Sequence, residues 1–251
     1  MEYIFLYIMV FLFGITIGSF LNVCIYRIPK QEDIVLERSH CMSCGNVLKW
    51  YELIPLFSFL IQGGKCKNCK AKLSWQYPLI ELTNGLLYLW VVIVKGFTIE
   101  SILFCICTSV LLVLAVIDFR TYEIPFGCNV IIGILGTVRM VTDLSHWYDY
   151  AIGFCTVSGL FLLVYLITRG RGIGGGDIKL MASAGLLLGW QNILLSLMIG
   201  SIAGSVIHLT LMKLKKKERV LAFGPYLALG IFAAMLYGNE MIKWYLSFFE
   251  L

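Results

Sequence analysis

The chain has 251 residues, of which 59% are hydrophobic and only 14% are charged. A soluble domain usually carries about 25% charged residues, and a disordered chain has few apolar ones, so this composition excludes both classes. The formal net charge of +5 would suit a nucleic-acid-binding protein. Apolar runs long enough to cross a bilayer indicate a multi-pass membrane protein instead, and we expect the lipid bilayer rather than nucleic acid as a partner.

The first apolar run, from Tyr3 to Tyr26, contains no charged residue and has about the length that spans ~30 Å of hydrocarbon. Glu2 precedes it, whereas a cleaved signal peptide begins with basic residues and has a shorter apolar core. We therefore expect a retained transmembrane helix. Further apolar segments predict an all-α polytopic membrane protein with about eight transmembrane helices. The predicted spans are residues 3–26, 79–95, 99–117, 124–141, 150–168, 178–190, 192–212 and 221–242.

One long polar segment, residues 27–78, interrupts the apolar series and holds eight of the 20 lysine and arginine residues. Basic residues concentrate in the cytoplasmic loops of membrane proteins. If this segment is cytoplasmic and successive loops alternate between the two sides of the membrane, 17 of the 20 basic residues lie on the cytoplasmic side. They include five within residues 213–219. The predicted domains are residues 1–26, a first transmembrane helix; residues 27–78, a small cytoplasmic segment; and residues 79–251, a seven-helix membrane domain. The three basic residues left outside are Lys95, Arg139 and Lys243.

Four of the nine cysteines form two C-x-x-C pairs in the cytoplasmic segment, Cys41 with Cys44 and Cys66 with Cys69. This spacing is typical of a tetrahedral zinc site. The alternative is two disulfides, which the reducing cytoplasm disfavours. Four thiolates leave no open coordination position, so the predicted Zn²⁺ is structural. A metal also suits a segment that is too short to build a core of its own.

Two aspartates stand at expected cytoplasmic helix ends. Asp118 follows the apolar run 102–117, and Asp177 opens the sixth span after a run of glycines that includes Gly174 and Gly176. A carboxylate near the membrane interior is costly, so such residues indicate a functional site by default. The alternative is an interfacial residue or, for Asp177, a helix cap. The glycines allow a close backbone approach, and the run lacks the Gly-Lys-Ser/Thr ending of a phosphate-binding loop.

Two carboxylates brought together would suit aspartic proteolysis. Like charges in one site separate the two pKa values, so that one carboxyl stays ionised and accepts a proton from water while the other stays protonated and polarises the scissile carbonyl. The spacing in the sequence does not show that Asp118 and Asp177 meet.

The chain carries several further ordered motifs over nearly its whole length. They comprise Gly18 to Val23, Tyr26 to Pro29, Arg38-Ser39, Gly64-Lys65, Ser74, Tyr77-Pro78, Glu81, Ile124-Pro125 behind Asp118, and Gly174-x-Gly176-Asp177-x-Lys179-Leu180. Together these motifs resemble those of the type IV prepilin peptidases, which are membrane aspartic proteases of the G-x-G-D class. Two positions depart from the common pattern: Met42 stands where many members have proline, and Phe126 where many have a further aspartate.

The resemblance implies that Asp118 and Asp177 are the catalytic pair, supported by Gly174, Gly176 and Lys179. It implies cleavage of prepilin or pseudopilin precursors after a glycine, on the cytoplasmic side of a bacterial inner or cytoplasmic membrane. Members with the cysteine segment usually also N-methylate the new N-terminus with S-adenosylmethionine, and Gly64 matches a glycine linked to that activity.

Two other classes of function remain open at this point. A proton-coupled membrane transporter with a zinc-stabilised cytoplasmic segment would also use intramembrane acids, but a relay should place them near mid-membrane rather than at one edge. A non-catalytic assembly scaffold would use the glycines and aspartates only to pack helices.

Overall fold

The computed structural model describes the backbone of residues 2–215 and 222–248, with the side chains of residues 4–210 and 222–248. The basic side chains expected within residues 213–219 lie outside the described residues. The chain divides into two compact units, Met1–Ser101 and Ile102–Leu251.

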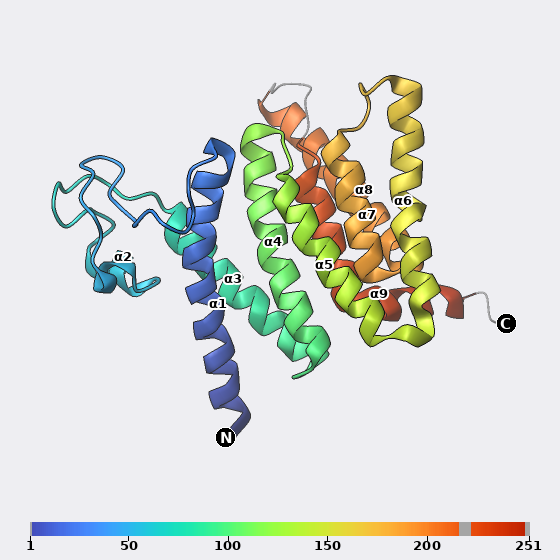
Figure 1. Cartoon of the computed structure of the whole chain (residues 1–251), viewed down its shortest axis with the longest axis horizontal. Coiled ribbons are helices and arrows are strands. Elements are labelled where there is room, and N and C mark those ends of the chain that lie inside the picture. The colour runs from blue at the N-terminus through green and yellow to red at the C-terminus, as the bar shows by residue number, and fades with distance from the viewer. Residues whose placement is uncertain (1, 216–221, 249–251) are drawn as a thin grey trace. The chain divides into compact units, whose positions relative to one another are not determined.

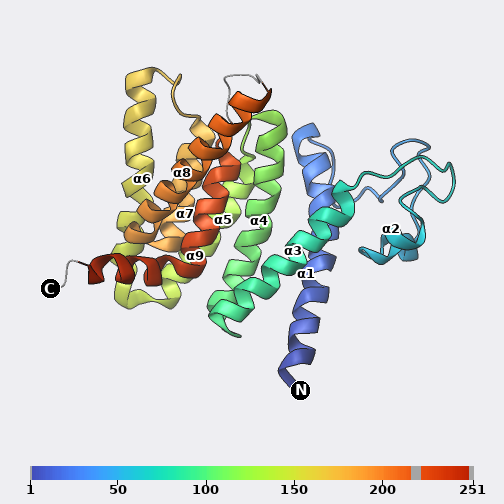
Figure 2. The same ribbon diagram turned by 180° about the vertical axis from the view of Figure 1, so that it is seen from behind.

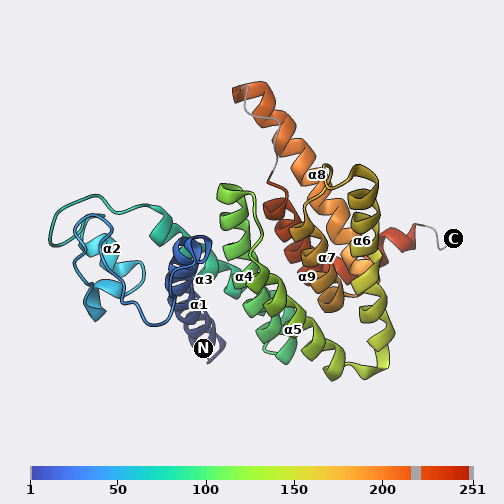
Figure 3. The same ribbon diagram turned by 45° about the horizontal axis from the view of Figure 1, so that its top comes forward.

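The first unit contains two long helices with a polar segment between them. This segment extends to one side of the two helices (Figures 1 and 3). Its regular structure is limited to short helices, and most of its large apolar side chains are exposed, among them Leu36, Trp50 and Ile61. In chain order the elements are α1 (Glu2–Arg27), the 3-10 helices η1 (Ile28–Lys30) and η2 (Trp50–Leu53), α2 (Phe57–Ile61) and α3 (Gln76–Lys95).

Helices α1 and α3 pack with their backbones in contact. A Cβ atom at Gly14 would lie 2.8 Å from the Cα atom of Gly85, and one at Gly18 would lie 2.7 Å from that of Glu81. The buried amide of Asn84 donates a hydrogen bond of 2.8 Å to the carbonyl oxygen of Gly14. Small residues and interhelical hydrogen bonds are the means by which helices associate in lipid, where no hydrophobic force drives them together.

The second unit is a helical bundle. Helix α7 packs against α5 and α6, and α8 packs against α9. The last turn of α4 and the first turns of α5, α7 and α9 lie at one end of the bundle, at the top of Figures 1 and 2. Helix α8 extends past its neighbours at this end (Figure 3). The elements are α4 (Ile99–Thr121), α5 (Phe126–Thr142), the 3-10 helix η3 (Leu144–His146), α6 (Trp147–Thr168), α7 (Gly175–Leu188), α8 (Trp190–Lys215) and α9 (Gly224–Ser247).

The expectation of an all-α membrane protein is confirmed, because each predicted span coincides with a helix and the described residues include no β-strand. Helices α1, α3, α4, α6 and α8 are long and apolar enough to cross a membrane. Helix α7 has 14 residues, or about 21 Å at 1.5 Å per residue, which is short of the hydrocarbon thickness. The total of eight spans therefore stays a prediction, as does the three-part domain division.

Two glycines set the packing of α6 against α7. A Cβ atom at Gly153 would overlap the carbonyl oxygen of Gly185, and one at Gly185 would overlap that of Gly153. Each obstacle is backbone, which cannot rotate out of the way as a flexible side chain could. The short helix α7 is therefore held against α6 at a distance that only glycine permits.

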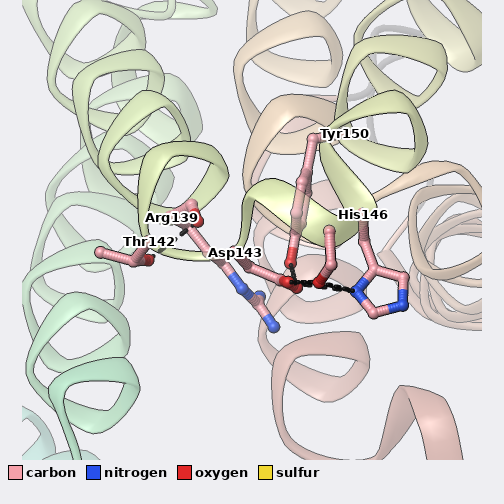
Figure 4. Close-up of polar contacts among 6 residues, drawn as sticks. Arg139, Thr142, Asp143, His146 and Tyr150 are labelled. Atoms are coloured by element: carbon pink, nitrogen blue, oxygen red, sulfur yellow. Dashed lines mark hydrogen bonds and ion pairs between the residues drawn. The ribbon is translucent and has the colours of Figure 1, made fainter.

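The guanidinium of Arg139, near the end of α5, contacts other residues of the chain (Figure 4). Its guanidinium donates a hydrogen bond of 2.9 Å to the carbonyl oxygen of Leu187, in the last turn of α7. It also lies 4.9 Å from the ring centroid of Phe104 and 5.7 Å from that of Tyr150. A cation at a helix C-terminus satisfies a carbonyl that has no partner within the helix. One of the three basic residues expected on the outer side thus has a structural role at the end of α7.

The carboxylate of Asp143, in the turn after α5, is the common partner of three nearby polar side chains (Figure 4). Its carboxylate accepts hydrogen bonds from the Ser145 hydroxyl at 2.7 Å and the Tyr150 hydroxyl at 3.0 Å, and it pairs with the ring of His146 at 3.1 Å. The Ser145 hydroxyl, followed by His146, lowers the pKa of Asp143 to about 2. The turn between α5 and α6 is thereby ordered around one ionised carboxylate.

We expect Gly153→Ala to destabilise the protein by about 2 kcal/mol, because the added methyl group would overpack against the backbone of α7. Gly159→Ala on the same helix is the matched control, since a Cβ atom there meets nothing within 4 Å. The control should be neutral or stabilising by up to about 1 kcal/mol, since alanine favours helix over glycine. Thermal unfolding in detergent measures both variants, and equal melting temperatures would contradict the close-packing account.

Candidate functional site

Asp118 lies in the last turn of α4 and is 5% exposed. One oxygen of its carboxylate, Oδ2, accepts a hydrogen bond of 2.9 Å from the backbone N–H of Gly224, the first residue of α9. A helix N-terminus stabilises negative charge because its first N–H groups have no partners within the helix. A Cβ atom at position 224 would lie 2.7 Å from the same carboxylate oxygen. Only glycine lets the start of α9 approach Asp118 this closely.

Asp177 is the third residue of α7, after Gly175 and Gly176. The backbone of Gly174 is hydrogen-bonded to its carboxylate, and a Cβ atom at Gly174 would lie 3.2 Å from Oδ2. A Cβ atom at Gly176 would lie 3.0 Å from the Cβ atom of Ile124. The glycines therefore bring the first turn of α7 against the segment that leads into α5. The same segment follows the last turn of α4, which contains Asp118.

The structure brings the two predicted aspartates into one site. The charge of Asp118 acts electrostatically on the carboxyl group of Asp177. Asp118 belongs to the last turn of α4 and Asp177 to the first turn of α7. Both turns lie at the end of the second unit where α9 also begins (Figures 1 and 2). Two interacting carboxyl groups in a partly buried site can share one proton, which is the arrangement that general acid–base hydrolysis requires.

Gly224 is a member of this site that the sequence did not reveal. The predicted span began at residue 221, whereas α9 begins at Gly224. The available signal was the pair Gly224-Pro225, because proline is favoured at the first position of a helix. That signal locates the start of the helix, but it does not indicate which carboxylate the helix meets.

Lys179 lies one turn into the same helix as Asp177. Its ammonium group is 5.3 Å from the ring centroid of Phe126, at the start of α5. A cation over an aromatic face is held by the electron-rich face of the ring. Phe126, which replaces a further acid of the family pattern, thus contacts the lysine that was expected to support Asp177.

The cysteines of the first unit form two knuckles with the same backbone pattern. The N–H of Cys41 donates to Asn46 O and the N–H of Cys66 donates to Ala71 O, at 2.9 and 2.8 Å. In each knuckle the fourth residue after the cysteine donates back to the cysteine carbonyl, at 2.8 Å from Gly45 and 3.0 Å from Lys70. Both of these residues have a positive φ. The repeated turn aims two pairs of sulfur atoms at a common point.

The four sulfur atoms of Cys41, Cys44, Cys66 and Cys69 lie within 4.8 Å of one another, so these residues can hold a metal ion. The Sγ atoms of Cys41 and Cys69 are 3.8 Å apart. Four sulfur atoms at about 2.3 Å from a tetrahedral zinc ion are also separated by about 3.8 Å. The donor set and its spacing therefore fit a closed, tetrahedral thiolate site.

Gly64 lies beside the second knuckle and lines a cleft of about 360 Å³. Its φ is +65°, and a Cβ atom there would lie 3.1 Å from the ring of Phe59. Trp75, whose ring centroid is 5.0 Å from that of Phe59, lines the same cleft together with Lys65 and Lys72. The site combines an aromatic surface with positive charge, and a side chain at position 64 would intrude on it.

Other residues of the sequence motifs have structural roles in the first unit. The guanidinium of Arg27 donates to the carbonyl oxygens of Asp33 and Glu37 at 2.7 and 2.9 Å, which orders the loop after α1. Glu81 on α3 accepts a hydrogen bond of 2.7 Å from the backbone N–H of Leu56. The amide of Asn22 on α1 donates to Tyr77 O at 3.1 Å. The contacts of Arg27 and Glu81 attach the polar segment to α1 and α3, and the contact of Asn22 joins these two helices to each other.

Comparisons with known proteins extend the resemblance over most of the chain. Residues 12–95 match the bacterial peptidase A24 N-terminal domain, and residues 105–209 match the type IV leader peptidase family. Three similar curated proteins, each named prepilin leader peptidase/N-methyltransferase, come from Bacillus subtilis, Pseudomonas aeruginosa and Legionella pneumophila. They are 35%, 32% and 31% identical, over 94%, 94% and 97% of this chain and 96%, 92% and 96% of the relative. No solved structure matches the chain.

Proposed function

The chain belongs to the type IV leader peptidase family, and from that premise we propose that it is an aspartic endopeptidase that removes the basic leader from type IV prepilin-like precursors. The observation that carries the aspartic mechanism is the placement of Asp118 and Asp177 at one end of the second unit, where the charge of Asp118 acts on the carboxyl group of Asp177. Both residues lie at helix ends, as a peptidase acting at a membrane edge requires. A proton-coupled transporter would instead need acids near mid-membrane.

In the proposed reaction the ionised carboxylate of the pair accepts a proton from water while the water oxygen bonds to the scissile carbonyl carbon. The protonated carboxyl donates its proton to the carbonyl oxygen. The carbon–nitrogen bond then breaks. The leaving nitrogen takes up a proton from the carboxyl that had received it, and the new carboxyl group of the leader returns a proton to the other aspartate, which restores the starting pair. The products are a leader with a new carboxylate and a mature protein with a new amine.

We place this reaction on the cytoplasmic side of a bacterial inner or cytoplasmic membrane, because 17 of the 20 basic residues fall on one side of the predicted topology. A prepilin or pseudopilin precursor has a short basic leader followed by an apolar helix. That helix would enter laterally from the bilayer and present the bond after its leader glycine to the aspartates.

The four-cysteine site would hold a structural Zn²⁺ ion. Cys41, Cys44, Cys66 and Cys69 supply four thiolates, which leave no position for water or substrate. The metal would stabilise the polar segment of the first unit, which has no core of its own, by ~10 kcal/mol or more of folding free energy. Zinc has no part in the proteolytic step.

The same protein is proposed to N-methylate the newly exposed N-terminus. S-adenosylmethionine, when bound, would supply the methyl group, which passes from its sulfur to the new amine with release of a proton. The cleft at Gly64 supports this assignment, since Phe59 and Trp75 offer an aromatic surface to a planar base and Lys65 and Lys72 offer positive charge to a carboxylate.

Cleavage of a precursor by the purified protein tests the aspartic mechanism. We expect Asp118→Ala and Asp177→Ala each to lower the cleavage rate by about 1,000-fold, since each removes one partner of the acid–base pair. Glu123→Ala, which removes an exposed acid five residues after Asp118, should leave the rate within about twofold of the parent. Full activity in either aspartate variant, at an unchanged melting temperature, would refute the assignment.

Metal analysis tests the cysteine site. The purified protein should contain about one zinc ion per chain, and Cys41→Ser should lose it because three thiolates bind far more weakly than four. Cys155→Ser, which alters an exposed cysteine of α6, should keep the full metal content. Unchanged zinc in Cys41→Ser would argue against a four-thiolate site.

Incorporation of labelled methyl groups into the cleaved product tests whether the cleft at Gly64 binds the methyl donor. Gly64→Ala should raise the donor concentration needed for half-maximal methylation by about tenfold, because its methyl group enters the cleft at Phe59. Gly96→Ala controls for the cost of a positive φ, since Gly96 has a φ of +71° and an added Cβ atom there meets nothing within 4 Å. If both variants methylate as the parent does, Gly64 does not line the donor site.

A further inference from the structure

Asn129, in the first turn of α5, carries a buried amide that meets no hydrogen-bond partner in the part of the chain that the structure describes. Its side chain belongs to a residue that is 3% exposed. Neither its Nδ2 nor its Oδ1 atom has a hydrogen-bond partner among the described residues. An amide offers two donor hydrogens and an acceptor oxygen, so both kinds of hydrogen-bonding capacity are unused here.

Buried polar groups are expensive to leave unpaired, above all in a membrane domain where no bulk water can reach them. Two other described side chains have a buried, unpaired polar atom, and both differ from Asn129. Asn192 still donates through Nδ2 to Leu188 O and to Asn239 Oδ1, at 3.2 and 3.1 Å, and Ser196 leaves only one small hydroxyl unpaired. An apolar residue would pack at position 129 without this penalty, so the amide points to a ligand that it binds during the reaction.

Contacts on either side of Asn129 in the sequence place it near the first turns of α7, which carry Asp177. Ile124 lies against Gly176, and a Cβ atom added at Gly133 would lie 3.5 Å from the hydroxyl oxygen of Ser183. Helices α5 and α7 therefore run side by side in the same direction from the aspartate end. Asn129 falls between these two contacts, about one helical turn deeper than Asp177.

We propose that Asn129 is a positioning residue that hydrogen-bonds the water molecule used by Asp118 and Asp177. Hydrolysis at a membrane edge needs a water molecule held in apolar surroundings, and a carboxamide can both donate to the water oxygen and accept one of its hydrogens. Held in this way, the water oxygen would face the scissile carbonyl while the ionised carboxylate takes its proton. This inference rests on the proposed peptidase function.

The test compares three variants of the full-length protein in detergent, with a synthetic precursor that carries a basic leader, a glycine and an apolar helix. Asn129→Leu keeps a similar volume without polar atoms, so it should melt at the same or a higher temperature than the parent. Its kcat should fall by about 100-fold with KM within about threefold. Asn129→Thr, which still offers a hydroxyl to water, should recover kcat to within about tenfold of the parent.

Ser196→Ala is the matched control, since Ser196 is fully buried and unpaired but lies on α8. It should keep kcat within about twofold of the parent. Asn129→Leu with full activity would overturn the inference while leaving the peptidase function intact. A loss of activity with a lower melting temperature would also overturn it, because Asn129 would then be structural. A parent protein that does not cleave the precursor would refute the peptidase function, and the inference with it.

Discussion

A polar side chain can lie inside a membrane domain only where the protein supplies its partner, because lipid offers none. Three side chains of this protein, two of them buried and that of Arg139 partly buried, meet that requirement in the same way, through a backbone group of another helix. Asn84 donates to the carbonyl of Gly14, Arg139 donates to that of Leu187, and Asp118 accepts from the N–H of Gly224. Each of these contacts satisfies a costly group and at the same time fixes how two helices meet.

Glycine makes several of these contacts possible. Gly14 lets α1 approach α3 closely enough for its carbonyl to reach Asn84, and Gly224 lets the start of α9 reach Asp118. The pair Gly153 and Gly185 holds α7 against α6 although α7 is short. The aspartate site is therefore assembled by backbone approach, and the proposed chemistry depends on residues that have no side chain.

The polar segment between α1 and α3, which contains the four cysteines, is stabilised in a different way. Between α1 and α3 the chain has too few buried apolar residues for a core, and its order comes from polar contacts and from two matching knuckles. Arg27 and Glu81 attach this segment to the helices through backbone groups. A bound metal would complete the same strategy, in which a few strong, directional contacts replace hydrophobic burial.

The sequence by itself determined the helix positions, the four cysteines that can hold a metal ion and the two candidate aspartates. These features depend on local patterns: runs of apolar residues, a C-x-x-C spacing and carboxylates at helix ends. Helix boundaries moved by only a few residues, as at the start of α9, because they depend on capping contacts. Only the tertiary structure decided that Gly224 meets Asp118, that Arg139 binds the end of α7, and that Asn129 has no hydrogen-bond partner among the described residues. Those facts join residues far apart in the chain, and no local pattern records which helices will lie side by side.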